Sequence, residues 1–331
     1  MNITESEWRS ALDVVRSAGA VVLMCHVSPD GDALGSSLAA GLALRKAGIE
    51  VQASYDDEPF TLPTRLQFLP GQDLLVAPNQ LSGRPLAVLT FDTGSIDRLG
   101  GLAGPAKAAD ALIVVDHHTT NTRYGTHHLI DADAAATAVV VLELVDRLGV
   151  QLDADIATAL YTGLTTDTGS FRFAATTPEV HEIAARLLRT GIAHERIARE
   201  VFDTRSLGYL RLLAAALERA ELEAAAVGGL GLVWTVVPAA DRQHFAVAFD
   251  EAEAVIGTLR ITEEAEVAAV CKETDSGAYA VSLRSKGTID VARLAVALGG
   301  GGHRYAAGFT STADLATTMQ RLRAEFEAAA T

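Results

Sequence analysis

Three apolar segments in the first half of the chain are each followed at once by histidine or aspartate. Residues 19–25, 85–91 and 111–115 carry no charge and show no alternation of polar and apolar side chains. Strands that are buried on both faces of a parallel sheet have this pattern. The residues that directly follow the three segments are His26, Asp92, Asp116 and His117.

Because the carboxyl ends of parallel strands share one edge of a sheet, these side chains are expected to meet there. Asp30 and Asp32 from the loop after the first segment, and Asp167 from a later turn, are expected to join them. Carboxylates that lie close together repel one another unless cations stand between them. Oxygen and nitrogen ligands without a thiolate favour manganese, with magnesium, cobalt or iron as alternatives. Two ions that share a bridging carboxylate could activate water for attack on phosphorus.

Each aspartate also has an ordinary structural explanation. Asp32 is well placed to cap a following helix, and Asp30 with the glycine after it can form a turn. Asp92 and Asp167 each precede a threonine–glycine pair, which is typical of turns. These explanations are reasonable one at a time, but they do not explain why ligand-type residues recur at strand ends.

The histidines divide into two groups. His117 and His118 follow the third apolar segment and could be either ligands or polar groups at a strand end. His127 and His128 follow no apolar strand that ends in aspartate, so we expect them to be surface or edge structure.

The order of the remaining elements predicts the fold class. Helical patterns at 33–47 and 134–148 each end at a glycine, and further helices are expected at 153–166, 178–190 and 193–203. Alternating strands and helices predict an α/β domain with a doubly wound, mainly parallel sheet. A single long helix over 206–226 is expected to be a connector. Strands near 229–237, 266–273 and 278–285 with helices near 290–298 and 313–329 then predict a smaller α+β domain.

Length and composition limit the possible functions. A chain of 331 residues suits about two domains, here 1–205, a connector at 206–226, and 227–331. The net charge of −15 disfavours a long nucleic-acid track, although it permits a short phosphorylated ligand. The two cysteines are far apart, which favours a reduced, cytoplasmic setting. We expect neither a signal peptide nor a membrane span.

Five segments together resemble a known family. In order, "HVSPDGDALGS", "FDTGS", "DHHTTN" and "GLTTDTGSF" resemble the four motifs of the DHH phosphoesterase superfamily. "GGGGHRYAAGF", residues 299–309, resembles the signature of its associated C-terminal domain. The two-domain layout is most similar to the nanoRNase and pAp-phosphatase branch. The resemblance implies hydrolysis of short oligoribonucleotides, 3′-phosphoadenosine 5′-phosphate (pAp) or, in some members, linear or cyclic dinucleotides.

The resemblance also implies two manganese ions with defined ligands. One ion would be held by His26, Asp30 and Asp92, and the other by Asp32, Asp92, His117 and Asp167, with Asp92 as the bridge.

The same motifs imply roles beside the metals. His118 would face the substrate phosphate, and Asp116 would fix the ring of His117. Asn121 would help to order the turn. Val139 departs from the family pattern, where relatives often carry glutamate, but no implied metal ligand is missing.

The far segment carries the candidate substrate contacts. Between residues 284 and 304, Arg284, Lys286, Arg293 and Arg304 stand against Asp290, which gives a local charge of +3 in an acidic chain. Arg284 and His303 are expected to contact phosphate, and Gly301 and Gly302 to form a backbone cradle. A flexible turn is the alternative for the glycines. Ser282 and Ser285 could donate hydrogen bonds, although an alternating strand exposes such residues anyway. Tyr305 could stack on a base or lie in the core.

The sequence therefore predicts a manganese-dependent phosphoesterase for short RNA or nucleotides. Alternatives are a manganese-dependent pyrophosphatase, a single-strand exonuclease and a non-catalytic nucleotide-binding regulator. The apolar stretch 136–145 could face a second subunit in a homodimer, but core burial is the favoured explanation.

Overall fold

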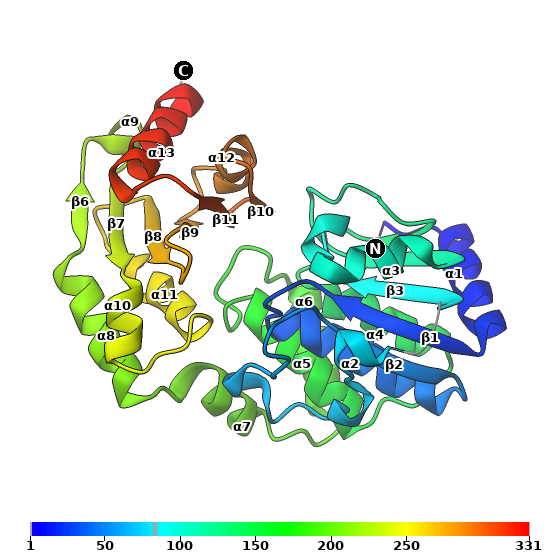
Figure 1. The fold of residues 1–331 in the computed structure, drawn as a ribbon. Helices are drawn as coiled ribbons and strands as arrows, with labels where there is room; N and C mark the ends of the chain where they lie inside the picture. Colours follow the sequence, from blue (N-terminus) through cyan, green and yellow to red (C-terminus); the bar gives the residue numbers. More distant parts are fainter. Residues whose placement is uncertain (1, 82–84, 331) are drawn as a thin grey trace. The chain divides into compact units, whose positions relative to one another are not determined.

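The computed structural model describes residues 2–81 and 85–330, which form two compact units with a division between Thr204 and Arg205 (Figure 1). Each unit is built around its own sheet. Among the described helices, none is both long enough and apolar enough to cross a bilayer.

The first unit contains a five-stranded sheet in which every pair of neighbours is parallel. Its strand order is β2-β1-β3-β4-β5, with bounds β1 (Ala20–Cys25), β2 (Glu50–Ser54), β3 (Ala87–Phe91), β4 (Ala111–Asp116) and β5 (His127–Ile130). Side chains of β3 and β4 are buried throughout, as the uncharged segments predicted. His127 and His128 lie on an edge strand, which confirms the expectation for this pair.

Helices cover both faces of this sheet. They are α1 (Glu5–Ala18), α2 (Gly31–Lys46), α3 (Ala103–Ala108), α4 (Thr137–Arg147), α5 (Ala154–Asp167), α6 (Pro178–Leu188) and α7 (His194–Ala198). One core joins Leu23, Leu89 and Val115 to helices that include α2, α4 and α5. A smaller core joins Met24 and Val88 on the opposite face to α3 and the 3₁₀ segment before it. The doubly wound architecture is therefore confirmed, and the apolar side of α4 packs in the core of its own chain.

Strand register places the candidate residues next to one another at the carboxyl edge of the sheet. Cys25 pairs with Phe91, and Phe91 pairs with Val115. The next residue along each of the three neighbouring strands is therefore His26, Asp92 or Asp116. Asp92 has a φ of 54°, a left-handed conformation that aspartate tolerates better than most residues.

Close packing of α2 against α5 brings two further aspartates to the same place. A Cβ at Gly35 would lie 2.4 Å from the Ala159 carbonyl oxygen, and a Cβ at Gly163 would lie 2.5 Å from an Asp32 carboxylate oxygen. Asp167 is the last residue of α5, so its predicted place in a turn is wrong. The helix continues to Asp167 because its apolar face remains buried in the core up to Leu164.

The second unit contains a mixed six-stranded sheet in the order β10-β11-β9-β8-β7-β6. Its strands are β6 (Glu221–Glu223), β7 (Leu232–Val237), β8 (Val267–Glu273), β9 (Tyr279–Ser285), β10 (Gly301–His303) and β11 (Ala306–Ser311). Its helices are α8 (Leu207–Glu218), α9 (Ala226–Gly229), α10 (Ala239–His244), α11 (Val255–Leu259), α12 (Val291–Ala297) and α13 (Leu315–Ala330). Two hydrophobic cores pack on its opposite faces, which confirms the smaller α+β fold.

The single helix predicted over 206–226 is wrong in its second half. Helix α8 ends at Glu218, and residues 221–223 form β6, which pairs with β7. Glu223 accepts hydrogen bonds from Trp234 and Arg323, so tertiary contacts override the helical propensity of this stretch. Tyr209 and Leu212 of α8 pack in a core of the second unit, which shows how the helix is held.

The α2–α5 contact predicts a stability effect. Gly35→Ala should lower the free energy of unfolding by about 1–3 kcal/mol, because the new methyl group meets backbone rather than a movable side chain. Urea unfolding would measure the change. Gly104→Ala is the matched control, since Gly104 is an exposed residue of α3 with open space around its Cβ position. Equal losses in both variants would contradict the close approach.

Candidate metal centre and substrate-binding residues

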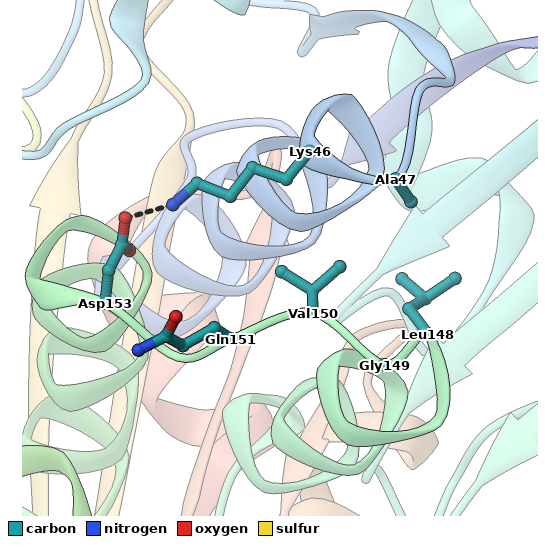
Figure 2. Close-up of a pocket in the computed structure, with 7 residues that line it drawn as sticks. All are labelled: Lys46, Ala47, Leu148, Gly149, Val150, Gln151 and Asp153. Carbon is teal, nitrogen blue, oxygen red and sulfur yellow. Dashed lines mark hydrogen bonds and ion pairs between the residues drawn. The ribbon is translucent and has the colours of Figure 1, made fainter.

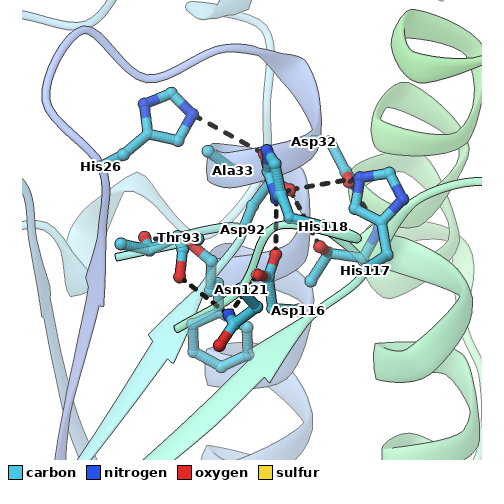
Figure 3. A network of polar contacts seen from close by, with 12 residues as sticks. His26, Asp32, Ala33, Asp92, Thr93, Asp116, His117, His118 and Asn121 are labelled. Carbon is cyan, nitrogen blue, oxygen red and sulfur yellow. Dashed lines mark hydrogen bonds and ion pairs between the residues drawn. The ribbon is translucent and has the colours of Figure 1, made fainter. Parts of the chain in front are cut away.

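The three strand ends converge on the carboxylate of Asp92 (Figure 3). Its Oδ2 lies 3.6 Å from His26 Nε2, and its Oδ1 lies 3.5 Å from His117 Nε2. Asp30 is 4.0 Å from His26 Nε2, while Asp167 and Asp32 are 3.0 Å and 3.8 Å from His117 Nε2. Asp92 thus presents one oxygen to each of two histidine–aspartate groups.

The ring nitrogens of both histidines are oriented by backbone carbonyls. His117 Nδ1 lies 3.0 Å from the Ala134 oxygen, and His26 Nδ1 lies 2.8 Å from the Val27 oxygen. A carbonyl oxygen only accepts, so each Nδ1 donates and each Nε2 faces the carboxylates. Arg98 approaches His26 Nδ1 at 3.4 Å, but the shorter carbonyl contact decides the tautomer. A neutral imidazole would then direct its Nε2 lone pair at carboxylate oxygens, so either a proton or a metal ion must lie between them.

The pKa values of the buried carboxylates and of His117 also favour a positive charge among them. Burial alone would raise the pKa of Asp92, but the imidazoles of His117 and His26 hold it well below its usual range. Burial opposes ionisation of His117, yet Asp167 and Asp92 raise its pKa well above the usual value. Burial, together with Asp92 and Asp167, raises the pKa of Asp32. Protons and metal ions therefore compete for the same nitrogen, and metal affinity should fall as pH falls.

Asp32 is fully buried and is held by the start of α4. Its carboxylate accepts hydrogen bonds from the Thr137 amide at 2.6 Å and the Ala138 amide at 3.0 Å. Ser36 Oγ donates to it at 3.1 Å. The alternative that Asp32 caps its own helix is wrong, because Asp30 accepts from the amides that a cap must satisfy. Asp32 is therefore fixed by a partner helix whose N-terminus favours negative charge.

Thr137 is a contributor that the sequence did not reveal. Besides its amide contact to Asp32, its hydroxyl donates to Asp92 Oδ1 at 2.9 Å. One residue thus contacts the carboxylates of both Asp32 and Asp92. The sequence placed Thr137 inside the helix expected at 134–148, whereas in the structure it is the first residue of α4, so no sequence signal marked it.

Asp116 orients a different histidine from the one expected. Its Oδ1 accepts from His118 Nδ1 at 2.7 Å, whereas His117 is oriented by a backbone carbonyl. The expectation that Asp116 fixes His117 is therefore wrong. Side chains alternate along an extended chain, which places Asp116 and His118 on one side and His117 on the other. Asn121 donates to the second Asp116 oxygen and to the Thr93 carbonyl, so it orders this turn as expected.

The residues fit two divalent ions. The donor atoms of His26, Asp30 and Asp92 lie within 4.8 Å of one another, and so do those of Asp32, Asp92 and His117. Both groups offer only oxygen and imidazole nitrogen, the ligands that suit manganese, magnesium or iron. Asp92 belongs to both groups, which is the arrangement required of a bridging ligand.

In the second unit, the two predicted serines already use their hydroxyl hydrogens. Ser282 donates to Glu253 at 2.7 Å, and Ser285 donates to Glu266 at 2.8 Å. A hydroxyl has one hydrogen, so neither serine can also donate to a ligand as placed. Arg284 lies 3.3 Å from Glu253 and donates to the Leu283 carbonyl.

Residues 301–303 of the glycine-rich segment form strand β10 rather than a flexible turn. A Cβ at Gly302, where φ is +139°, would lie 2.6 Å from the Ala306 oxygen, so pairing with β11 explains that glycine. Gly301 has open space at its Cβ position and remains compatible with close approach of a ligand. His303, the last residue of β10, is half-buried.

A surface hollow elsewhere in the first unit is lined by Lys46 and Ala47 at the end of α2, by residues 148–151 and by Asp153 (Figure 2). Lys46 and Asp153 form an ion pair there. None of the predicted site residues lines this hollow, so it has no part in the candidate chemistry.

Comparison with known families agrees with this geometry. Residues 20–164 match the DHH family, N-terminal domain, and residues 233–331 match the DHHA1 domain. The chain therefore belongs to the DHH family and carries a DHHA1 domain.

Two sequence relatives and one solved structure are similar to this chain over most of its length. The bifunctional oligoribonuclease and PAP phosphatase NrnA of Thermus thermophilus is 36% identical over 292 residues, or 88% of this chain and 84% of the relative. The protein of the same name from Bacillus subtilis is 26% identical over 293 residues, 87% of this chain and 88% of the relative. An exopolyphosphatase-related protein from Bacteroides fragilis shares the fold, with a TM-score of 0.87 at 22% identity over 99% of this chain and 98% of that one.

The contact between Thr137 and Asp92 can be tested through metal affinity. Thr137→Val keeps the side-chain shape and the amide donated to Asp32 but removes the hydroxyl. We expect manganese affinity, measured by isothermal titration, to fall about 10–100-fold, as is usual when a group that orients a metal ligand is lost. Thr137→Ser restores the hydroxyl and should retain affinity. Equal affinities for the valine variant and the parent protein would show that the contact does not matter.

Proposed function

We propose that this protein is a manganese-dependent phosphoesterase that hydrolyses short oligoribonucleotides and pAp. The observation that carries the proposal is the position of Asp92, with one carboxylate oxygen facing each of two imidazoles. That the chain is a hydrolase of phosphoester bonds follows from its DHH family membership. The choice of substrates is supported by the Thermus relative, whose name gives both activities.

The proposed metal ligands are those that the motifs implied. One ion is assigned to His26, Asp30 and Asp92, and the other to Asp32, Asp92, His117 and Asp167. When bound, such ions polarise the phosphate and lower the pKa of water. Manganese is proposed from the mixed carboxylate and imidazole ligands.

His118 is proposed to donate a proton to the leaving oxygen. Burial would lower its pKa, but the hydrogen bond to Asp116 raises it above the usual value. The same contact holds Nδ1 and fixes the orientation of the His118 ring. Asn121 holds the other oxygen of Asp116, which fixes the direction of this pair.

In the second unit, Arg284, His303 and the amide of Gly301 are proposed to bind phosphate. Arg284 suits this role because its planar guanidinium can donate two parallel hydrogen bonds. Ser282 and Ser285 are not part of this proposed set, since their hydrogens go to Glu253 and Glu266. A cytoplasmic setting is proposed from the two buried cysteines, neither of which forms a disulfide.

The bridging role of Asp92 predicts the largest loss of activity. Asp92→Ala should lower release of mononucleotide from a labelled dinucleotide by about a thousandfold, because the lost stabilisation is worth several kcal/mol. Elemental analysis should also show reduced metal content. Asp97→Ala is the control, since Asp97 is exposed and only five residues away. Near-normal turnover by folded Asp92→Ala protein would refute the shared ligand.

The charge distribution of the chain predicts a preference for short substrates. The local +3 segment is short and the chain has a net charge of −15, so each added phosphate gains little attraction. We expect oligoribonucleotides of about two to four residues to be cleaved more efficiently than one of about 24 residues. Rates should be compared at several salt concentrations, because screening should reduce the difference. Faster cleavage of the long substrate at low salt would favour an exonuclease instead, and pyrophosphate hydrolysis would favour a pyrophosphatase.

A further inference from the structure

Glu253 lies at the centre of a small charged cluster in the second unit. It belongs to the 3₁₀ segment Glu251–Ala254, directly before α11, and reaches the neighbouring strands β8 and β9. Its Oε2 accepts from Lys272 on β8 and from Ser282 on β9, the latter at 2.7 Å. Its Oε1 lies 3.3 Å from Arg284 on β9. One carboxylate therefore collects donors from three separate side chains.

Strand register explains why these donors face the same side. Val270 is paired with Ser282, and Ala268 is paired with Arg284. Val270 and Ala268 pack in the core beneath α8 and α11, so their partners project to the face that Glu253 occupies. Lys272 has the same parity on its strand, two residues beyond Val270. The cluster is therefore built into the sheet and does not depend on a chance meeting of surface side chains.

Glu253 remains ionised in this position. Burial would raise its pKa, but Lys272 and Arg284 hold it below the usual value. An ionised carboxylate only accepts hydrogen bonds, so it orients every donor around it. Two cations against one carboxylate leave the cluster with a residual positive charge, which suits an incoming phosphate.

The cluster leaves part of Arg284 available. A guanidinium has five N–H donors, and the contacts found in the described part of the chain engage two of its nitrogens, through Glu253 and the Leu283 carbonyl. Its side chain is 25% exposed, whereas that of Lys272 is 7% exposed and packs 5.1 Å from the Phe249 ring. Arg284 is thus held on one side and accessible on the other.

We infer that Glu253 is a positioning residue that fixes the guanidinium of Arg284 for a phosphate group of the nucleotide. The inference rests on the proposed function, in which Arg284 binds phosphate. Fixing a long side chain before binding reduces the rotamer entropy that is lost on binding. Ser282 belongs to the same arrangement because its hydroxyl holds the second oxygen of Glu253.

An opposite role is also conceivable for a carboxylate in this place. Glu253 could compete with phosphate for Arg284, and its removal would then strengthen substrate binding. The 3.3 Å contact engages one nitrogen of Arg284 and leaves most of its donors to a phosphate, which favours positioning over competition. The two roles predict changes of KM in opposite directions.

The test measures KM and kcat for pAp in manganese with the full chain carrying Glu253→Gln. We expect KM to rise about tenfold with kcat changed less than about twofold, because only binding is affected. Glu253→Asp keeps the charge and should recover most of the loss. Glu223→Gln is the matched control, since it breaks a glutamate–arginine pair with Arg323 elsewhere in the same unit. An unchanged or lower KM in Glu253→Gln would overturn the inference.

A second comparison separates positioning from general damage to the fold. In an Arg284→Ala background, Glu253→Gln should raise KM by less than about twofold, because its target is already gone. A further tenfold rise there would overturn the inference and leave the proposed function intact. Should Arg284→Ala itself leave KM unchanged, both the phosphate role of Arg284 and the inference fail. Binding of pAp to metal-free protein by isothermal titration gives the same comparisons without catalysis. A protein that binds pAp but does not hydrolyse it would contradict the proposed function and leave the inference about Glu253 testable.

Discussion

Mutual repulsion among buried carboxylates is the constraint on which the first unit depends. Asp32 is fully buried beside Asp92 and Asp167, and its carboxylate keeps a place there only because α4 offers two amides and α2 offers a hydroxyl. The N-terminus of a helix carries partial positive charge, so the direction of α4 matters as well as its position. Strand register places the candidate residues side by side. Hydrogen bonds from α2 and α4 then stabilise the buried carboxylate of Asp32.

Much of this arrangement could be predicted from the sequence because the signals were local. Uncharged segments identified the buried parallel strands, and the residue after each segment belongs to the candidate metal centre. Partners that depend on tertiary contacts could not be predicted in this way. In the sequence Thr137 is one residue within the helix expected at 134–148, and only the structure shows its hydroxyl 2.9 Å from Asp92. The pairing of Asp116 with His118 was accessible in principle, because alternation along an extended chain places both side chains on one side.

Tertiary contacts also limited what the sequence could predict in the second unit. The stretch 219–226 has a helical composition, yet pairing with β7 makes part of it a strand. Ser282 and Ser285 have the right chemistry for ligand contacts, but glutamates from distant segments accept their hydrogens. The two units also use charge in opposite ways. The first surrounds imidazoles with carboxylates, while the second surrounds the carboxylate of Glu253 with cations.

Gly163 limits which substitutions the chain can accept, because helix packing at this glycine also places a carboxylate of the candidate metal centre. It has no functional group, yet the space that a Cβ would need there is occupied by an oxygen of Asp32. Any larger residue must displace either helix α5 or a proposed metal ligand. A survey of all substitutions for retained activity would therefore score position 163 as severely as the aspartates, although it takes no part in the reaction. Evolutionary drift in this family should be slow at such positions, and an intolerant glycine on a helix could reveal a ligand on the neighbouring helix.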